Sequence, residues 1–378
     1  MGVRGAVWAL ANQLGVVAGT PGELLSALLA APPRAVRVRL PPEAAELAAA
    51  LRDLGHIRVD LTGPPPAPPE PVSPADLDDP AAVCAADPVS TTAAYEADDG
   101  HDDGHGGLRA AWLRAGQSVI RDQDPADRAL VLLTALDDTA DPRLRPALTE
   151  LSAGAPWSLA RTTRRPCTAL TTTRGGRLVV PAERALAVAC LADGTRLVLD
   201  ERGRPHVREG APTPLTRAVT ATLARHPATA LAAGGGRILA GDRTGTVHAF
   251  GLDGVHQEAL HSGRVTALTA TTAGAPTVTA PTVAYSGGAD GTVRAWRPGR
   301  TPDRAPVTER RHPVVALHAT ADGLLAVAWA DGLAELRRLG TGEALTFRPG
   351  PRIRAVAVTG DGALVVGLDD ALLALSPS

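Results

Sequence analysis

In the C-terminal part of the chain, short apolar runs alternate with polar residues and end at a glycine-centred turn, and this unit recurs. The turns lie at Gly203, Gly245, Gly291 and Gly332, with steps of 42, 46 and 41 residues between them. A fifth copy, ALVVGLDDALLAL, closes the sequence with an Asp-Ala pair in place of the glycine. Because Asp-Gly and Thr-Gly pairs permit the positive φ of a tight hairpin, each copy predicts paired β-strands.

A unit of about 40 residues with several strands predicts a β-propeller. A single four-stranded sheet cannot bury both of its faces, so neighbouring sheets must stack around an axis. We expect about five blades, the first imperfect or incomplete, because Gly176–Val180 lies too near the first full repeat to supply a whole blade. The final run, Ala371–Leu375, should pair with a strand from Trp157–Thr171, which closes the ring and removes an open edge.

The third copy, GGADGTVRAW, resembles the end of a WD repeat. The resemblance implies that Asp290 organises the turn and that Trp296 packs between blades, with Phe250 in the tryptophan position one blade earlier. The other copies depart from the family, since none of them shows a Gly-His pair and Arg208 and Arg337 stand where the aromatic residue belongs. We therefore expect a degenerate WD-repeat propeller that lacks most of the family's hydrogen-bonded tetrads. Its turn and inter-blade residues would be Gly203, Gly245, Phe250, Asp290, Gly291, Trp296 and Gly332.

The N-terminal part of the chain has a different pattern. Ala35–Leu40 and His56–Leu61 alternate apolar and charged residues, as strands with one polar face do. Between them, Pro42–Gly55 places leucines at helical spacing. Upstream, we expect a strand at Gly15–Gly19 and a helix over Pro21–Ala30. The order β-α-β-α-β predicts a small parallel sheet.

These patterns describe a multidomain protein in which an all-β propeller follows a small α/β domain and a helical region. A proline-rich stretch acts as an extended spacer after the α/β domain. The predicted parts are the α/β domain 1–62, the linker 63–80, the mostly helical region 81–157 and the propeller 158–378. Within the helical region we expect helices at Gly107–Ala115, Pro125–Leu136 and Pro142–Ala153, the last two opened by Asp-Pro pairs.

Composition narrows the chemistry. All 38 basic residues are arginine, so Schiff-base chemistry and a lysine that grips a nucleotide phosphate are excluded. The scarcity of residues with AT-rich codons indicates a GC-rich bacterial genome. Cys84, Cys167 and Cys190 have no metal-binding spacing, as expected of a reduced cytoplasmic protein. No membrane span is expected, and the apolar start is a poor signal peptide because Asn12 and Gln13 interrupt it.

Charge divides the chain in two. Residues 1–160 hold 12 arginines and 22 acidic residues, whereas residues 161–378 hold 26 arginines and 18 acidic residues. The division has three explanations: two solvated surfaces of opposite sign, an acidic N-terminal half docked on the basic propeller, or an anionic partner for the propeller. The scatter of arginines through all blades favours the first. Nucleic acid is not an expected partner, because no basic cluster is interleaved with aromatic residues.

One segment has the frame of a phosphate-binding loop. Gly19–Ser26, GTPGELLS, has leucines in place of the second glycine and the lysine of that motif, so an active ATPase is not expected. The same residues fit a capping box, in which Thr20 caps a helix and Glu23 bonds back to it. In that helix Leu25 would be buried together with Leu28 and Leu29.

Leu130–Asp138, LVLLTALDD, resembles the magnesium-binding strand of signal-transducing P-loop ATPases, which are often fused to WD propellers. It fits equally well as a helix that begins after Asp124-Pro125. This resemblance is weaker than the one to WD repeats.

Other polar clusters give no site. Asp98–His105 concentrates carboxylates and imidazoles that could bind a divalent metal, but such Gly/Asp/His loops are typically solvated spacers, so no metal is expected. His256 and His261 are expected on the surface, and the remaining histidines suggest no triad. Ser262 and Ser286 lack the context of a nucleophile elbow.

The sequence therefore predicts a non-enzymatic scaffold without cofactor. The WD resemblance implies a rigid ring surface that binds protein partners. One alternative is a relic of a signalling P-loop ATPase that has lost nucleotide binding and whose propeller senses a ligand. Another is an enzyme with an unrecognised site on the propeller face. Nucleotide binding would favour the relic, and a stoichiometric protein partner would favour the scaffold.

Overall fold

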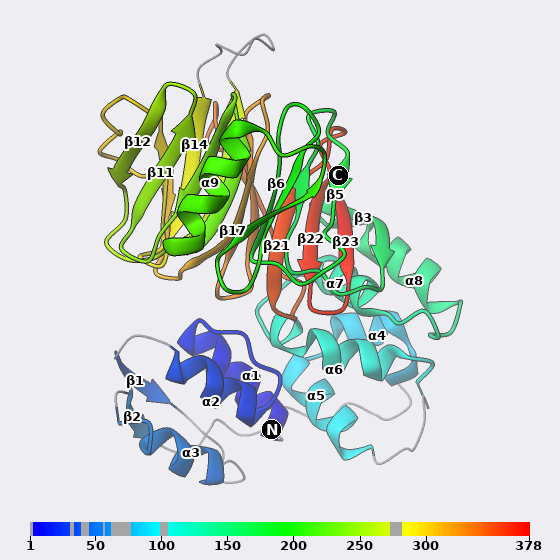
Figure 1. Ribbon diagram of the computed structural model, residues 1–378. Helices are drawn as coiled ribbons and strands as arrows, with labels where there is room; N and C mark the ends of the chain where they lie inside the picture. Colours follow the sequence, from blue (N-terminus) through cyan, green and yellow to red (C-terminus); the bar gives the residue numbers. More distant parts are fainter. Residues whose placement is uncertain are drawn as a thin grey trace. The chain divides into compact units, whose positions relative to one another are not determined.

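The computed structural model describes residues 3–30, 34–38, 45–55, 57–61, 77–98, 105–272 and 282–378. The chain forms two compact units (Figure 1). The first contains Met1–Leu159 with Arg348–Arg352 and Pro377–Ser378, and the second contains Ala160–Phe347 with Ile353–Ser376. None of the helices in the described part of the chain has the length and hydropathy that a membrane span requires.

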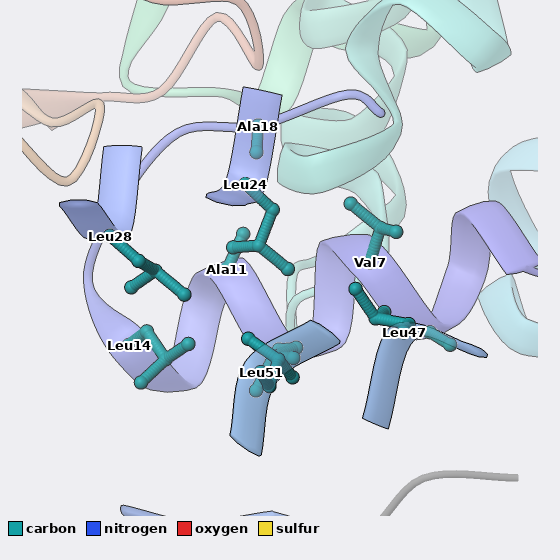
Figure 2. Packing of buried hydrophobic residues seen from close by; sticks show 10 residues of the cluster. Val7, Ala11, Leu14, Ala18, Leu24, Leu28, Leu47 and Leu51 are labelled. Atoms are coloured by element: carbon teal, nitrogen blue, oxygen red, sulfur yellow. The ribbon is translucent and has the colours of Figure 1, made fainter. Parts of the chain in front are cut away.

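The first unit begins with a small core built on helices. Its elements are α1 (Val3–Leu14), α2 (Pro21–Leu29), β1 (Arg34–Val38), α3 (Ala45–Arg52) and β2 (Ile57–Leu61). The strands β1 and β2 pair in parallel, so the predicted β-α-β segment is confirmed. The apolar start of the chain forms α1, which the sequence did not assign. Its Val7 and Leu14 pack with Leu24, Leu28 and Leu51 in one buried cluster (Figure 2).

The predicted strand at Gly15–Gly19 is wrong, because α1 ends there. The first residue of that segment is left-handed, with φ +64°, and the Val16 N–H donates to Ala11 O at 3.0 Å, which is a C-terminal helix cap. The side chain of Gln117 then donates to Val16 O at 2.6 Å and accepts from the Ala18 N–H at 3.0 Å. This side chain takes the hydrogen bonds that a neighbouring strand would have made.

The helical region that was expected before the propeller is present. It contains α4 (Pro80–Ala85), α5 (Pro88–Ala97), α6 (Leu108–Val119), α7 (Pro125–Ala135), α8 (Leu144–Leu151) and the 3-10 turn Ser152–Gly154. The stretch Leu130–Asp138 begins inside α7 and is no strand, so the resemblance to a magnesium-binding strand is wrong and its helical alternative is right. Helix α8 starts later than predicted, at Leu144, and the Asp141 carboxylate ahead of it accepts from the Arg143 N–H at 2.9 Å and binds the Arg143 side chain at 2.6 Å.

The rest of the chain forms a five-bladed β-propeller, as predicted (Figure 1). The first blade has three strands and the other four blades have four strands each. The first blade contains β6 (Ala187–Cys190), β7 (Arg196–Leu199) and β8 (Pro205–Glu209), and the second contains β9 (Ala230–Gly234), β10 (Arg237–Gly241), β11 (Thr246–Gly251) and β12 (Gly254–Ala259). The third contains β13 (Val265–Thr272), β14 (Thr282–Gly288), β15 (Thr292–Trp296) and β16 (Thr308–Glu309), and the fourth contains β17 (Val314–Ala319), β18 (Leu324–Trp329), β19 (Ala334–Arg338) and β20 (Ala344–Phe347). The fifth contains β21 (Ile353–Val358), β22 (Leu364–Leu368) and β23 (Leu372–Pro377) and is completed by β3 (Trp157–Thr163).

The closure of the ring is confirmed. The last strand β23 lies between β22 and β3, so a strand from before the repeats completes the fifth blade. The Ser378 N–H donates to Pro156 O at 3.1 Å, at the end of this pairing. A hairpin of β4 (Thr171–Thr172) and β5 (Leu178–Val179) lies beside it, where β4 contacts β21 of the last blade and β6 of the first. Closure matters because an unpaired terminal strand would be an aggregation edge.

The first blade has a helix in place of its fourth strand. Helix α9 (Pro214–Arg225) is capped by Thr213, whose hydroxyl accepts from the Thr216 N–H. Its Val219 and Leu223 are buried with Leu231 of the next blade. The sequence analysis did not find this helix, which fills the outer part of a blade that is one strand short.

Candidate interaction surface

In the first three blades, the turn glycine holds the turn between the second and third strands close to the segment that follows the blade's last element. Gly203, Gly245, Gly291 and Gly332 have φ values of +78°, +98°, +77° and +80°. A Cβ on Gly291 would overlap the carbonyl oxygen of Arg310, whose own N–H donates to Gly291 O at 2.9 Å. Gly245 is packed in the same way by its next segment. Glycine is therefore needed here both for the backbone conformation and for the close approach.

His261 is buried, so its expected place on the surface is wrong. Its Nε2 lies 2.8 Å from Ser286 Oγ, and its Nδ1 lies 3.1 Å from both Asp290 Oδ1 and Thr292 Oγ1. The Ser262 N–H donates to the other Asp290 oxygen. Burial lowers the pKa of His261 against the opposing effect of Asp290. A tetrad-like network thus exists in the third blade, with a leucine before the histidine where the WD pattern has glycine.

These groups are arranged in the order of a Ser-His-Asp triad, but the serine and the histidine are not accessible to a substrate. Ser286 has no exposed surface, and neither does the His261 side chain. A nucleophilic serine must reach a substrate carbonyl, and this one cannot. Trp296, the fourth residue of the WD pattern, donates from its indole nitrogen to Arg300 O at 2.9 Å. The network therefore braces the turn and the loop between blades.

The fourth blade uses an arginine for the same purpose. Arg310 lies four residues before β17, just as His261 lies four residues before β13. Its Nη2 is 2.9 Å from the carboxylate of the buried Asp331, and its guanidinium lies 5.5 Å from the centre of the Trp329 ring. The signal that could have found this pair was the repeated Asp-Gly turn in the two blades.

The first two blades share a third arrangement. In each, an aspartate three residues before the turn glycine bonds a histidine three residues after it. The distances are 2.9 Å for Asp200–His206 and 3.0 Å for Asp242–His248. Both histidines are partly exposed. These pairs fix the hairpin turns within one blade and make no contact that suggests catalysis.

The phosphate-loop frame is filled by the protein's own groups. The Gly19 N–H donates to the Glu23 carboxylate at 2.7 Å, and the Glu23 N–H donates to Thr20 Oγ1 at 3.2 Å. The Ala18 N–H is bonded to Gln117. A phosphate-binding loop presents such N–H groups to an anion, whereas here they are occupied and a carboxylate already lies at the helix N-terminus.

The helix after this loop is buried on a different face from the one predicted. Leu24 and Leu28 have no exposed surface, Leu25 is half-buried at the edge of the cluster and Leu29 is 66% exposed. The predicted burial is therefore right for Leu28 and wrong for Leu25 and Leu29, because Leu24 takes the buried position in place of Leu25. Figure 2 shows Leu24 and Leu28 directed into the cluster of α1 and α3.

Only the two ends of the acidic His-rich segment are described. His105 Nε2 lies 2.8 Å from Asp98 Oδ2, and its Nδ1 bonds Asp78. The ring packs edge-on to Tyr95, with centroids 5.4 Å apart. The described residues contain no group of three His, Cys, Asp or Glu side chains placed to hold a metal ion. Residues 99–104 lie outside the described part.

A groove of about 440 Å³ opens between the second and third blades. One wall is β12 and the other is the loop after β15, whose turn approaches so closely that a Cβ on Gly299 would lie 3.4 Å from the His256 ring. The groove exists because the outer strand of the third blade, β16, has only two residues. Its lining residues are His256, Gln257, Glu258, Trp296, Gly299, Arg300, Thr301 and Pro302.

Apolar and basic side chains surround this groove. Leu252 and Val255, on the hairpin that carries β12, are 89% and 57% exposed. Three exposed arginines lie on the loop, namely Arg297, Arg300 and Arg304, and none of them is ion-paired within the described part of the chain. At the hairpin tip, the side chain of Arg237 binds Asp253 and lowers the pKa of that carboxyl.

The first unit has a larger hollow, of about 710 Å³, along α8 and the loop before it. Its lining is partly apolar, with Leu136, Pro142 and Pro146, and partly acidic. Asp141, one of its carboxylates, is already bound by Arg143, and this ion pair lowers the pKa of Asp141 to about 2. This hollow offers no arrangement for chemistry.

No protein-family model and no curated protein matches the chain. Among solved structures, it is similar to the RRP9 WD40 repeats, with 12% identity and a TM-score of 0.36 over 59% of this chain and 98% of that chain. It is also similar to Chaetomium thermophilum Sqt1 bound to the N-terminus of ribosomal protein L10, with 16% identity and a TM-score of 0.38 over 55% of this chain and 64% of that chain. It is also similar to a computationally designed protein, Ika8, with 18% identity and a TM-score of 0.36 over 56% of this chain and 70% of that chain. The propeller assignment itself rests on the five sheets and their closure.

Proposed function

We propose that this protein is a non-enzymatic interaction scaffold whose propeller binds a protein partner at the groove between its second and third blades. The observation that carries the proposal is the pair of exposed apolar side chains, Leu252 and Val255, on the hairpin whose strand β12 forms one wall of the groove. Exposed apolar residues that lie close together mark interaction sites more often than scattered ones do.

The geometry supports this function over the two alternatives. An enzyme needs an accessible nucleophile or base, and the Ser286–His261–Asp290 arrangement is closed to solvent. A P-loop that still binds nucleotide needs free N–H groups, and those of Gly19 and Glu23 are bonded within the chain. Neither argument applies to a surface that works by binding.

The test is co-purification from the native host with the full chain carrying Leu252→Ser and Val255→Thr together. The matched control is Leu186→Ser, since Leu186 is 46% exposed on the first blade. Mass spectrometry should find a stoichiometric partner with wild type and with the control, and that partner should be lost with the double variant. Thermal melts establish that all three chains are folded. Equal recovery with the double variant would refute the site, and a co-purified nucleotide would favour the relic.

A further inference from the structure

The strand β12 has a free edge. Among the described strands it is the outermost of its sheet and pairs only with β11, in a register that joins Gly251 to Gly254 across a two-residue turn. Along an antiparallel hairpin, residue pairs that are hydrogen-bonded to each other alternate with pairs that are not. The Leu260 N–H donates to Gly245 O at 3.0 Å, so the same alternation continues to the end of β12. The N–H and C=O groups of the residues in between, at 255, 257 and 259, therefore point away from the blade.

The outer positions of the first, third and fourth blades lack such an edge, whereas β3, the outer strand of the fifth blade, has seven residues and no proline. The strand β16 is two residues long, and β20 is four residues long and is followed by Pro349 within two residues. In the first blade α9 stands where the outer strand would be. In contrast, β12 has six residues and no proline. Proteins usually shorten or interrupt an exposed edge, so an uninterrupted one is available for a further strand.

The two faces next to this edge differ in chemistry. His256 and Glu258 point to the groove, whose far wall carries the unpaired Arg300 with Arg297 and Arg304 nearby. Val255 points to the opposite face, with Leu252 at the end of the hairpin. A strand added here would place alternate side chains on the arginine side and on the apolar side.

We infer that β12 accepts an extended acidic segment of a protein partner as a fifth strand of the second blade. Acidic residues of that segment would face the arginines of the loop, and the apolar residues between them would cover Val255 and Leu252. The segment's backbone would bond the free groups at Val255, Gln257 and Ala259. This inference rests on the proposed function and specifies the chemistry of the partner.

The test uses fluorescent peptides of about eight residues, long enough to span β12, with the full chain at low salt. A peptide of alternating glutamate and valine should bind about tenfold more tightly than one of alternating lysine and valine. Arg300→Glu should remove most of this preference. Arg338→Glu is the matched control, because Arg338 comes at the same spacing after the turn glycine Gly332 in the fourth blade as Arg297 does after Gly291 in the third.

Strand addition is tested separately with two N-methylated forms of the acidic peptide. One is methylated at the valines and the other at the glutamates, and only one edge of an added strand faces β12. One form should therefore lose binding by about tenfold and the other should keep it. Hydrogen exchange in 254–259 should slow with the bound peptide and stay unchanged in 344–347.

Equal binding of acidic and basic peptides would overturn the charge assignment, and equal binding of both methylated forms would overturn strand addition. Either result leaves the proposed function standing if the Leu252/Val255 variant still loses its partner. If that variant keeps its partner, the proposed function fails by itself. A peptide that binds equally well to Arg300→Glu and wild type would also refute the inference.

Discussion

Acid should destabilise the propeller through His318, a histidine that links three of its inner strands. His318 lies in β17, with its ring buried. Its Nδ1 accepts from the Val358 N–H of β21 at 3.1 Å, so the proton is on Nε2, which donates to Thr172 Oγ1 of β4 at 3.1 Å. A second proton would place a donor against a donor and a charge in an apolar interior. Burial accordingly lowers the pKa of His318 from 6.5 to about 4.

The sign and size follow from linkage. In the unfolded chain His318 takes up its proton near pH 6.5, whereas the folded chain takes it up only near pH 4. Between these values the unfolded state holds more protons, so stability is complete above pH 6.5, falls as the pH falls, and levels off below about pH 4. At about 1.4 kcal/mol for each unit of pKa difference, the full effect is about 3 kcal/mol.

The assay compares wild type with His318→Gln, because the other titrating groups then cancel. The variant leaves the Val358 N–H without its acceptor, which should cost about 1–3 kcal/mol at pH 7. As the pH falls to 4, the stability of wild type relative to the variant should decrease by about 3 kcal/mol. Urea unfolding is measured at each pH, and a hydrogen-exchange pulse at one fixed pH labels the unfolded fraction of β17 and β21. A stability difference that stays constant with pH, or that grows in acid, would refute the reasoning.

Three further predictions concern glycine, core and loop. Gly291→Ala should lower the stability of the fold by more than about 1 kcal/mol in thermal melts, because Gly291 has a positive φ and a Cβ there would overlap the next segment. Gly340→Ala, which has open space around it, should leave the stability almost unchanged. Equal melting temperatures for the two variants would contradict this packing. Leu24→Ala should destabilise the first unit by about 2–5 kcal/mol in urea unfolding, and the half-buried Leu25→Ala clearly less, so a reversed order would refute the assigned helix face. Calorimetric titration with ATP and magnesium should show no binding at the loop 19–26, and micromolar affinity would promote the ATPase-relic alternative.

Gly254 is not a suitable control for Gly291. A Cβ there would meet no atom within 4 Å. Its φ is +116°, however, so alanine would be strained in spite of the space. This is why Gly340 serves as the control for Gly291.

The sequence by itself determined the repeating architecture. Tight turns and alternating strands depend on neighbouring residues, so the spacing of Gly203, Gly245, Gly291 and Gly332 was sufficient to place the blades. The count of five and the pairing of the final strand also followed, because a repeat unit must cover its faces and its edges. The helix cap at Thr20 was local too and is present, although the Glu23 carboxylate bonds back to the Gly19 N–H and not to Thr20.

Tertiary structure decided whatever depends on a distant partner. Residues 15–19 form no strand, because Gln117, about a hundred positions away, takes their hydrogen bonds. His261 is buried because Ser286 and Asp290 come from other strands to meet it. The groove beside β12 exists because the neighbouring blade ends in a two-residue strand. Local pattern sets which elements form, but burial and hydrogen bonding are settled only when elements from far along the chain are packed together, and the candidate site belongs to that second kind.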